Sequence, residues 1–105
     1  MPETFLRLAD FKGHKAWDAR DIAEVEGASV RLHWTDAPYI WHVNDGTEVF
    51  LVLDGIVDMH VREGGIERVL ELSPFDAFVA KPGDEHVAHP RGEARILVIE
   101  RKGSV

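Results

Sequence analysis

The sequence predicts an all-β domain, and three observations support that prediction. Apolar and polar residues alternate with a period of two in several short segments, which is typical of strands with one buried face. Turn-forming pairs that contain glycine or proline separate these segments. No window has the three-to-four spacing of an amphipathic helix, apart from a weak pattern at residues 15–26. Short strands at this spacing favour a sandwich or a barrel.

The predicted strands follow one another along most of the chain. In the segment 29–35, Val30, Leu32 and Trp34 alternate with polar side chains. A continuous apolar run at 49–53 is typical of a buried strand. The other predicted strands are 56–63, 66–72 and the mostly apolar segment 94–101. The first 20 or so residues have the least pattern, and we expect an arm or edge strand there.

Glycine and proline mark the predicted turns. Asp54-Gly55 lies between two apolar strands and predicts a hairpin, because glycine tolerates the positive φ of a type I′ turn. Gly64-Gly65 predicts a second hairpin of the same kind. Ser73-Pro74, Pro82-Gly83 and Arg91-Gly92 indicate further turns. Phe75 and Phe78, which follow the third of these turns, are expected in the core.

Length and composition limit the classes of protein that fit. A chain of 105 residues predicts one domain, which can bury roughly 65% of its unfolded surface. The absence of cysteine excludes disulfides and thiolate metal sites. A formal net charge of −7 without a basic block argues against nucleic-acid or membrane-surface binding. No signal peptide is visible and the longest apolar runs have about five residues, so a cytoplasmic location is expected.

A polar cluster precedes the apolar run at 49–53. His42, Asn44 and Glu48 share a parity, so on an extended chain their side chains point to one side. Phe50 and Val52 share the same parity. The sequence therefore directs an imidazole, an amide and a carboxylate toward the side that also carries core residues.

These residues resemble the two signature motifs of the cupin family. The first motif, G-x5-H-x-H-x3–4-E-x6-G, is matched in residues 36–55 by His42, Glu48 and Gly55. The second, G-x5-P-x-G-x2-H-x3-N, is matched in residues 75–90 by Gly83 and His86. The resemblance covers about residues 29–101 and is greatest to small single-domain cupins described as similar to mannose-6-phosphate isomerase. Nothing in the chain resembles a dedicated sugar-phosphate site.

The chain departs from the motifs at several positions. Asn44 stands where the family has its second histidine, which is a metal ligand. The other departures lie in predicted turns or at the end of the second motif: Asp36, Phe75, Lys81 (with Pro82 one step later) and Pro90.

The resemblance implies a double-stranded β-helix, a jelly-roll-like barrel with a small cavity at its mouth. One cupin domain would span residues 1–105, with 1–28 as an N-terminal arm or edge strands and 29–101 as the barrel. His42, Glu48 and His86 would bind a divalent transition metal ion, since two imidazoles and one carboxylate suit Fe(II) and accept Mn(II), Ni(II) or Zn(II). Asn44 would be a weak oxygen ligand, form a hydrogen bond to a bound water, or contact the ligands without contacting the metal.

The resemblance also implies which residues surround the cavity. Phe50 and Val52 would pack below the metal, and Asp84 and Glu85 would lie at the rim. His60 is on the polar face of an alternating strand, which is exposed unless that face is the inner one of a closed barrel. His14, His33 and His89 are expected at the surface. Structural or interface roles are expected for Trp34, Tyr39 and Trp41.

Three functions remain open at this point. The first is a metal-dependent enzyme, such as an isomerase or dioxygenase, that acts on a small molecule. The second is a non-catalytic cupin that binds a small ligand, and the third is a cupin that has lost its metal. Cupins commonly pair through the sheet whose outer parity here includes Val49, Leu51 and Leu53, so a homodimer is expected.

Overall fold

The computed structural model describes residues 4–104, and every regular element in this range is a β-strand. The strands are β1 (Asp18–Val25), β2 (Ala28–Thr35), β3 (His42–Val43), β4 (Glu48–Asp54), β5 (Val57–Glu63), β6 (Ile66–Leu72), β7 (Ala77–Ala80), β8 (Glu85–Pro90) and β9 (Ala94–Arg101). The all-β prediction is confirmed. Within the same range no helix is long and apolar enough to cross a membrane.

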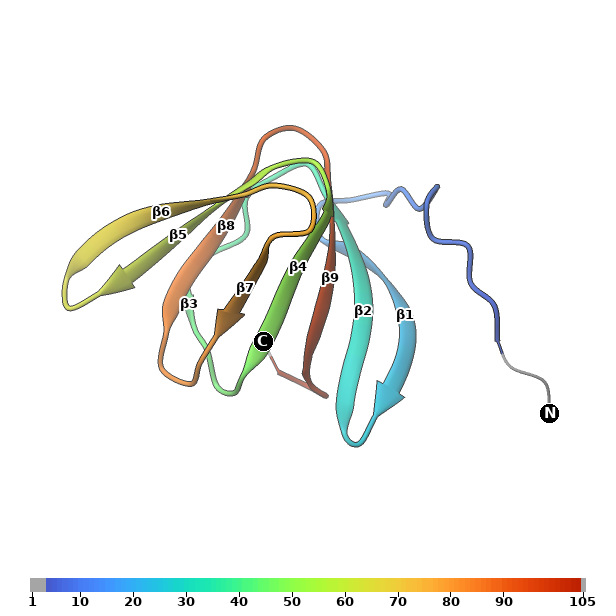
Figure 1. The fold of residues 1–105 in the computed structure, drawn as a ribbon, viewed down its shortest axis with the longest axis horizontal. Helices are drawn as coiled ribbons and strands as arrows, with labels where there is room; N and C mark the ends of the chain where they lie inside the picture. The colour runs from blue at the N-terminus through green and yellow to red at the C-terminus, as the bar shows by residue number, and fades with distance from the viewer. Residues whose placement is uncertain (1–3, 105) are drawn as a thin grey trace.

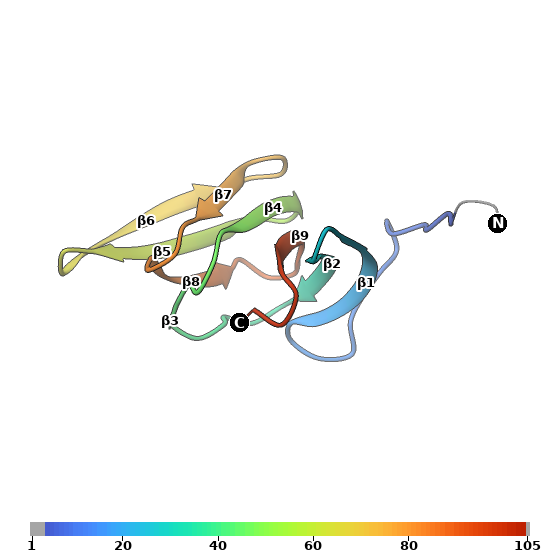
Figure 2. The same ribbon diagram turned by 90° about the horizontal axis from the view of Figure 1, so that it is seen from below.

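The strands form two antiparallel sheets. The first has the order β1-β2-β9-β4-β7 and the second the order β3-β8-β5-β6. Figure 1 shows the first sheet from β7 to β1, and Figure 2 shows the β5–β6 hairpin projecting away from the side where the chain begins. Some sheet neighbours are distant in sequence, as β9 lies between β2 and β4. The last strand is therefore brought beside β4, which begins at Glu48.

The core lies between the two sheets. Its buried side chains come from β4 and β9 on one side and from β5, β6 and β8 on the other, and they form one cluster. Val52, Val57, Met59 and Ile96 have no exposed surface. Burial of such side chains stabilises the fold by about 1.5–3 kcal/mol each. This packing fixes the distance between the sheets.

The Asp54-Gly55 turn does not form the predicted hairpin. The strands on either side of it, β4 and β5, belong to different sheets, so the turn carries the chain across the core. Gly55 has a φ of 82°, and a Cβ atom there would lie 2.4 Å from the carbonyl oxygen of Glu93. Close backbone contact at a corner therefore explains this glycine. Gly64-Gly65 does join two paired strands, β5 and β6, as predicted.

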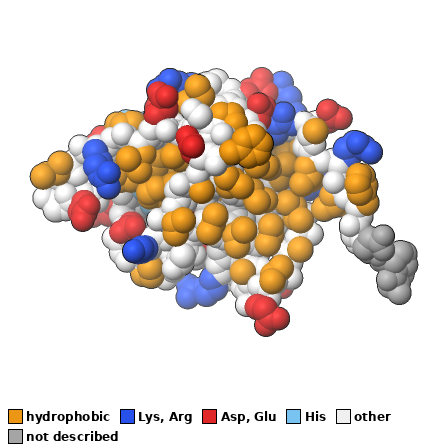
Figure 3. Space-filling model, in the orientation of Figure 1, with side chains coloured by type: hydrophobic (Ala, Val, Ile, Leu, Met, Phe, Trp, Pro, Cys, Tyr) orange, Lys and Arg blue, Asp and Glu red, His pale blue; other side chains and the backbone are white. Residues whose placement is uncertain are grey.

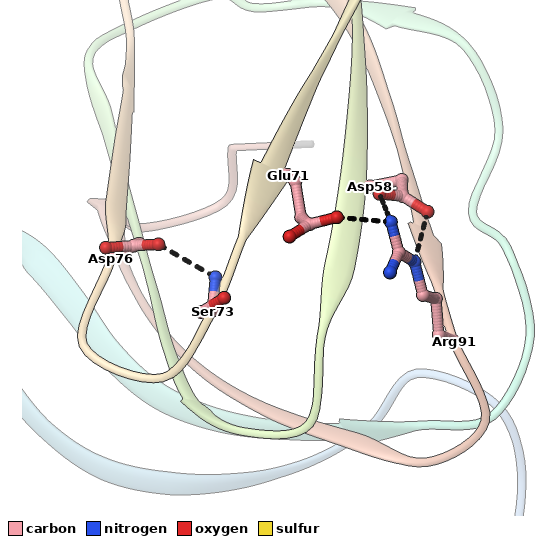
Figure 4. Close-up of polar contacts among 5 residues, drawn as sticks. All are labelled: Asp58, Glu71, Ser73, Asp76 and Arg91. Carbon is pink, nitrogen blue, oxygen red and sulfur yellow. Dashed lines mark hydrogen bonds and ion pairs between the residues drawn. The ribbon is translucent and has the colours of Figure 1, made fainter.

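Phe75 was expected in the core, but its side chain is 80% exposed. The turn between β6 and β7 holds Phe75 at a φ of 74°, and its N–H donates to the Val52 carbonyl at 2.7 Å. The Asp76 carboxylate closes the turn by accepting from the Ser73 N–H at 2.8 Å (Figure 4). The turn thus fixes the backbone and directs the ring outward, whereas Phe78 packs against the core.

Residues 18–25 form a strand, although 15–26 has a weak helical pattern. β1 pairs with β2 and lies at the edge of the five-stranded sheet.

On the other sheet, Arg91 donates to Asp58 of β5 at 2.8 Å and to Glu71 of β6 at 2.6 Å (Figure 4). These exposed ion pairs each contribute at most about 1 kcal/mol. They nevertheless connect the loop after β8 to its neighbouring strands.

Candidate functional site

Three strands bring His42, Glu48 and His86 together. His42 on β3 and His86 on β8 are direct neighbours in the antiparallel register, and their ring centroids are 4.2 Å apart. Glu48 begins β4 on the other sheet, and its Oε1 lies 3.4 Å from Nε2 of His86. One ligand atom from each residue lies within 4.8 Å of the other two. The two sheets therefore converge on one set of two imidazoles and one carboxylate.

The tautomer of His42 suits a metal ligand. Its Nδ1 lies 3.0 Å from the carbonyl oxygen of Ile40, so Nδ1 carries the proton and Nε2 presents a lone pair. His86 is 2% exposed, and its Nδ1 has no hydrogen-bond partner among the described residues. Only one of the two imidazoles is therefore oriented by a backbone acceptor.

Glu48 is paired with a second carboxyl group that the sequence did not indicate. Glu100 of β9 stands opposite Glu48 in the β4–β9 register. Burial opposes ionisation of Glu48, but hydrogen bonds with His86 and Glu100 outweigh burial and hold the pKa of Glu48 below its ordinary value. Burial, together with the hydrogen bond and charge of Glu48, raises the pKa of Glu100 to about 8. At neutral pH, Glu48 is thus an anion and Glu100 a neutral acid.

A cavity of about 270 Å³ adjoins these residues. The lining includes His42, Glu48 and His86, and Phe50, Met59 and Val98 contribute apolar surface. The other lining residues are Trp17, Arg31, His33, Tyr39, Ala88, Glu100 and Ser104. Concave sites with mostly apolar walls and a few polar groups are typical of small-molecule binding. The cavity is large enough for a small organic molecule.

Several of the lining residues were not predicted from the sequence, for different reasons. His33 was expected at the surface, but the face of β2 that carries Arg31 and His33 turns toward the cavity. Glu100 has the parity of the buried residues of β9, and this signal could have identified it. Trp17 lies in a segment without periodic pattern and gave no signal.

Asn44 is not brought to the cavity. β3 ends at Val43, and the turn that follows breaks the strand alternation that Asn44 was expected to continue. The side chain is 5% exposed, and its amide nitrogen donates to the Gly46 carbonyl. The Asn44 backbone bonds to Gly83 and Asp84, at 2.8 and 2.9 Å. Asn44 therefore stabilises the loop below the ligands, and its amide nitrogen is occupied within that loop.

The other expected pocket residues differ in position. Phe50 lines the cavity, but Val52 lies deeper in the core. Glu85 and His60 alternate with inward residues, so they face outward: Glu85 pairs with Arg62 at 3.3 Å, and His60 with Glu67 at 3.2 Å. The exposed Asp84 carboxylate accepts from the Lys81 N–H at 2.9 Å, which closes the turn before β8. None of these three polar residues lines the cavity described above.

The donor set fits a divalent transition metal ion. Two imidazoles and one carboxylate leave further coordination positions open, and Fe(II), Mn(II), Ni(II) and Zn(II) all accept such ligands. The set contains no thiolate and too few oxygen atoms for Ca²⁺. The chemistry of the residues present is therefore that of a transition-metal site.

Solved structures share this architecture. A cupin-2 domain protein from Shewanella frigidimarina has a TM-score of 0.76 and 26% identity, over 86% of this chain and 85% of its own. A cupin superfamily protein from Desulfitobacterium hafniense has a TM-score of 0.73 and 16% identity, over 96% and 93% of the two chains. The chain has the cupin fold. The prediction of a jelly-roll cupin barrel is confirmed.

A structure that contains Fe(II) is also similar. Fe(II)-HppE, solved with the alternative substrate (S)-1-HPP, has a TM-score of 0.67 and 11% identity. The match covers 78% of this chain and 48% of that one, so it concerns one part of a larger protein. No family model matches the chain, and no curated protein matches it at a significant level. These likenesses establish the fold alone, because proteins that share one fold can have different functions.

Proposed function

We propose that this cupin binds a divalent transition metal ion through His42, Glu48 and His86 and a small molecule in the adjoining cavity. The observation that carries the proposal is the convergence of the three ligand atoms within 4.8 Å, from strands of both sheets. Because Nδ1 of His42 is engaged by the Ile40 carbonyl, Nε2 is available to the ion. Fe, Mn, Ni and Zn are all candidates.

The proposed activity is that of a metal-dependent isomerase or dioxygenase. A bound ion would supply Lewis acidity or, as Fe(II), a redox centre. Glu48 would be occupied as a ligand and would not serve as a general base. Glu100 lines the same cavity and would hold or deliver a proton beside the ligands. The use of Fe(II) in HppE supports this proposal by analogy of fold.

A cavity without metal is the second candidate. The contact of 3.4 Å between Glu48 and His86 lets each group satisfy the other when no ion is bound. The protein would then be a non-catalytic cupin that binds a small ligand. The expected likeness to mannose-6-phosphate isomerase stays a sequence-based prediction.

Metal affinity separates these candidates. Protein purified without an affinity tag and stripped with chelator would be titrated with Fe(II), Mn(II), Ni(II) and Zn(II) by calorimetry. We expect at least one ion to bind with a dissociation constant below about 1 μM and the variants His42→Ala and His86→Ala to lose at least about 100-fold in affinity. Failure of all four ions to bind at this level would exclude the metal site.

The outer face of the second sheet supplies matched controls. His60 and His89 also form a close imidazole pair, with ring centroids 4.3 Å apart. The variants His60→Ala and His89→Ala should therefore keep the wild-type affinity. Oxygen consumption by Fe(II)-loaded protein, with small acids, diols and sugars as substrates, would then distinguish an enzyme from a binding protein.

We also propose a homodimer formed through the outer face of the five-stranded sheet. Val49 and Leu51 of β4 point away from the core, beside Leu97 and Ile99 of β9. Figure 3 shows hydrophobic side chains gathered over the area where Figure 1 places β4, β9 and β2. Contiguous apolar surface of this kind is typical of subunit contacts.

A further inference from the structure

Besides Nδ1 of His86, two buried polar atoms of residues that line the cavity have no hydrogen-bond partner in the described part of the chain. Within residues 4–104, the indole Nε1 of Trp17 and Nδ1 of His33 are buried without a hydrogen bond. Both residues line the cavity. Leaving such groups unsatisfied destabilises the folded state, so each one calls for a physical explanation. A ligand in the cavity would supply the missing hydrogen bonds after a small shift of the side chains that cover these two atoms.

The backbone of Trp17 is strained. Its φ of 59° is a left-handed conformation that bulky residues rarely adopt. The Asp18 carboxylate holds the preceding turn by accepting from the His14 N–H at 3.0 Å. The indole packs edge-to-face against His33 and Tyr39, with centroid distances of 6.1 and 5.3 Å. Backbone strain of this kind concentrates at functional sites.

Arg31 adds a positive charge to the same wall. It lies two residues before His33 on β2, and both side chains line the cavity. Asp21 accepts from Nε of Arg31 at 2.7 Å, and its side chain is 82% exposed, so solvent screens its charge. The terminal nitrogens of the guanidinium have no other hydrogen-bond partner among the described residues. They remain available to a ligand.

The chemistry of these groups selects the ligand. The Trp17 indole and the Arg31 guanidinium can only donate, so the group they bind has to accept. Hydrogen bonds from a cation to an anionic acceptor are about twice as strong as neutral ones, which favours a carboxylate over a hydroxyl group. Glu48 lines the same cavity beside the proposed ligands, and its negative charge disfavours a second anionic group there.

We infer that Trp17, His33 and Arg31 form a subsite for the carboxylate of a small organic acid, with the rest of that molecule directed toward His42, Glu48 and His86. This inference rests on the proposed function in one respect, that the cavity is the ligand site. It adds the substrate class, a monocarboxylic acid, and assigns Arg31 as the residue that selects for the negative charge, with the Trp17 indole as a second donor.

The indole protons allow a direct test. The chain has three tryptophans, so a ¹H–¹⁵N spectrum contains three indole signals, which the variants Trp17→Phe and Trp34→Phe assign. Isobutyrate, isobutyramide and isobutanol, which have the same carbon skeleton, would be titrated into metal-free and Zn(II)-loaded protein. We expect isobutyrate to move the Trp17 signal saturably in at least one form, and the amide and alcohol to bind at least about tenfold more weakly.

Variants distinguish binding at the subsite from indirect effects of a substitution on the protein. Trp17→Phe keeps the ring and removes the N–H, and Arg31→Met removes the charge; each should weaken isobutyrate binding about tenfold or more, as observed through the methyl signals of the ligand. Arg31→Lys should restore part of the loss. Trp34→Phe is the matched control, because Nε1 of Trp34 donates to Glu93 at 3.1 Å outside this cavity.

The outcomes of the isobutyrate titration can be told apart from the outcomes of the metal titration. A saturable Trp17 shift without metal binding would support the subsite while the proposed metal function fails. Metal binding with no Trp17 shift in either form, or equal shifts with isobutanol, would overturn the subsite and leave the metal site standing. Unchanged affinity in both Trp17→Phe and Arg31→Met would also overturn it.

Discussion

Glu48 and His86 come from different sheets, and Oε1 of Glu48 lies 3.4 Å from Nε2 of His86. This contact links β4 to β8 beside the cavity. The core below it sets the separation of the sheets, because Phe50 and Val52 of β4 pack in one cluster with Ala88 of β8. The geometry of the proposed metal site therefore depends on the packing of the barrel.

Asn44→Ala should destabilise the protein without affecting metal affinity. The Asn44 amide is buried and donates to the Gly46 carbonyl, so its loss should lower the free energy of unfolding by about 1–3 kcal/mol. Chemical denaturation and calorimetric metal titration would measure the two quantities. A loss of metal affinity as large as that of His86→Ala would instead identify Asn44 as a ligand.

The pH dependence of stability should reflect Glu100. Its pKa is raised to about 8 in the folded state, from an ordinary value of about 4.5. The folded protein therefore holds a proton that the unfolded chain releases between these values, so this group destabilises the fold as pH rises through that window. Glu100→Gln, which stays neutral, should gain stability relative to the metal-free wild type from pH 5 to pH 8, as measured by urea denaturation.

A stability difference between Glu100→Gln and the wild type that stays constant from pH 5 to pH 8 would contradict this prediction, because Glu100 would then bind its proton equally in the folded and unfolded states.

The two kinds of glycine turn should respond differently to alanine. Gly55→Ala should lower the free energy of unfolding by more than about 3 kcal/mol, because its Cβ would lie 2.4 Å from the Glu93 carbonyl oxygen and its φ is positive. Gly64→Ala should cost only about 1–2 kcal/mol, since no atom lies within 4 Å of its Cβ position. Thermal and urea denaturation would compare them, and equal losses would contradict the close contact at Gly55.

A matched pair of valines tests the proposed dimer. Val79 lies on the five-stranded sheet and Val69 on the other, and they are 50% and 51% exposed. Val79→Glu should shift the protein toward monomer because it buries a charge in the proposed contact, whereas Val69→Glu should leave the assembly unchanged. Analytical ultracentrifugation would measure both. A wild-type monomer, or a dimer lost only in Val69→Glu, would exclude this interface.

The strands could be predicted from the sequence because alternation is a local property. This property located 56–63, 66–72 and 94–101 closely, although only 56–63 alternates cleanly between an apolar and a polar face. Alternation does not show which face turns inward when both are partly covered. On β2, Leu32 and Trp34 are buried, yet His33 between them lines the cavity. The position of His33 depends on the pairing of β2 with β9, which no local pattern encodes.

Turns and loops were harder to predict because their residues fit several geometries. The same Asp-Gly pair suits a hairpin and a corner between sheets, and only the topology distinguishes them at Gly55. Phe75 and Asn44 lie where turns replace strand alternation, so parity could not place their side chains. Trp17 is positioned by a strained turn in a segment without pattern. The cupin motifs predicted that His42 and His86 lie close together, although the two strands that carry them are far apart in the sequence.

Anomalous X-ray diffraction from crystals grown with Zn(II) would test the metal proposal most directly. The predicted result is a zinc peak within about 2.0–2.2 Å of one atom each from His42, Glu48 and His86. No peak among these three side chains, or a peak only at other residues such as His60 and His89, would contradict the proposal.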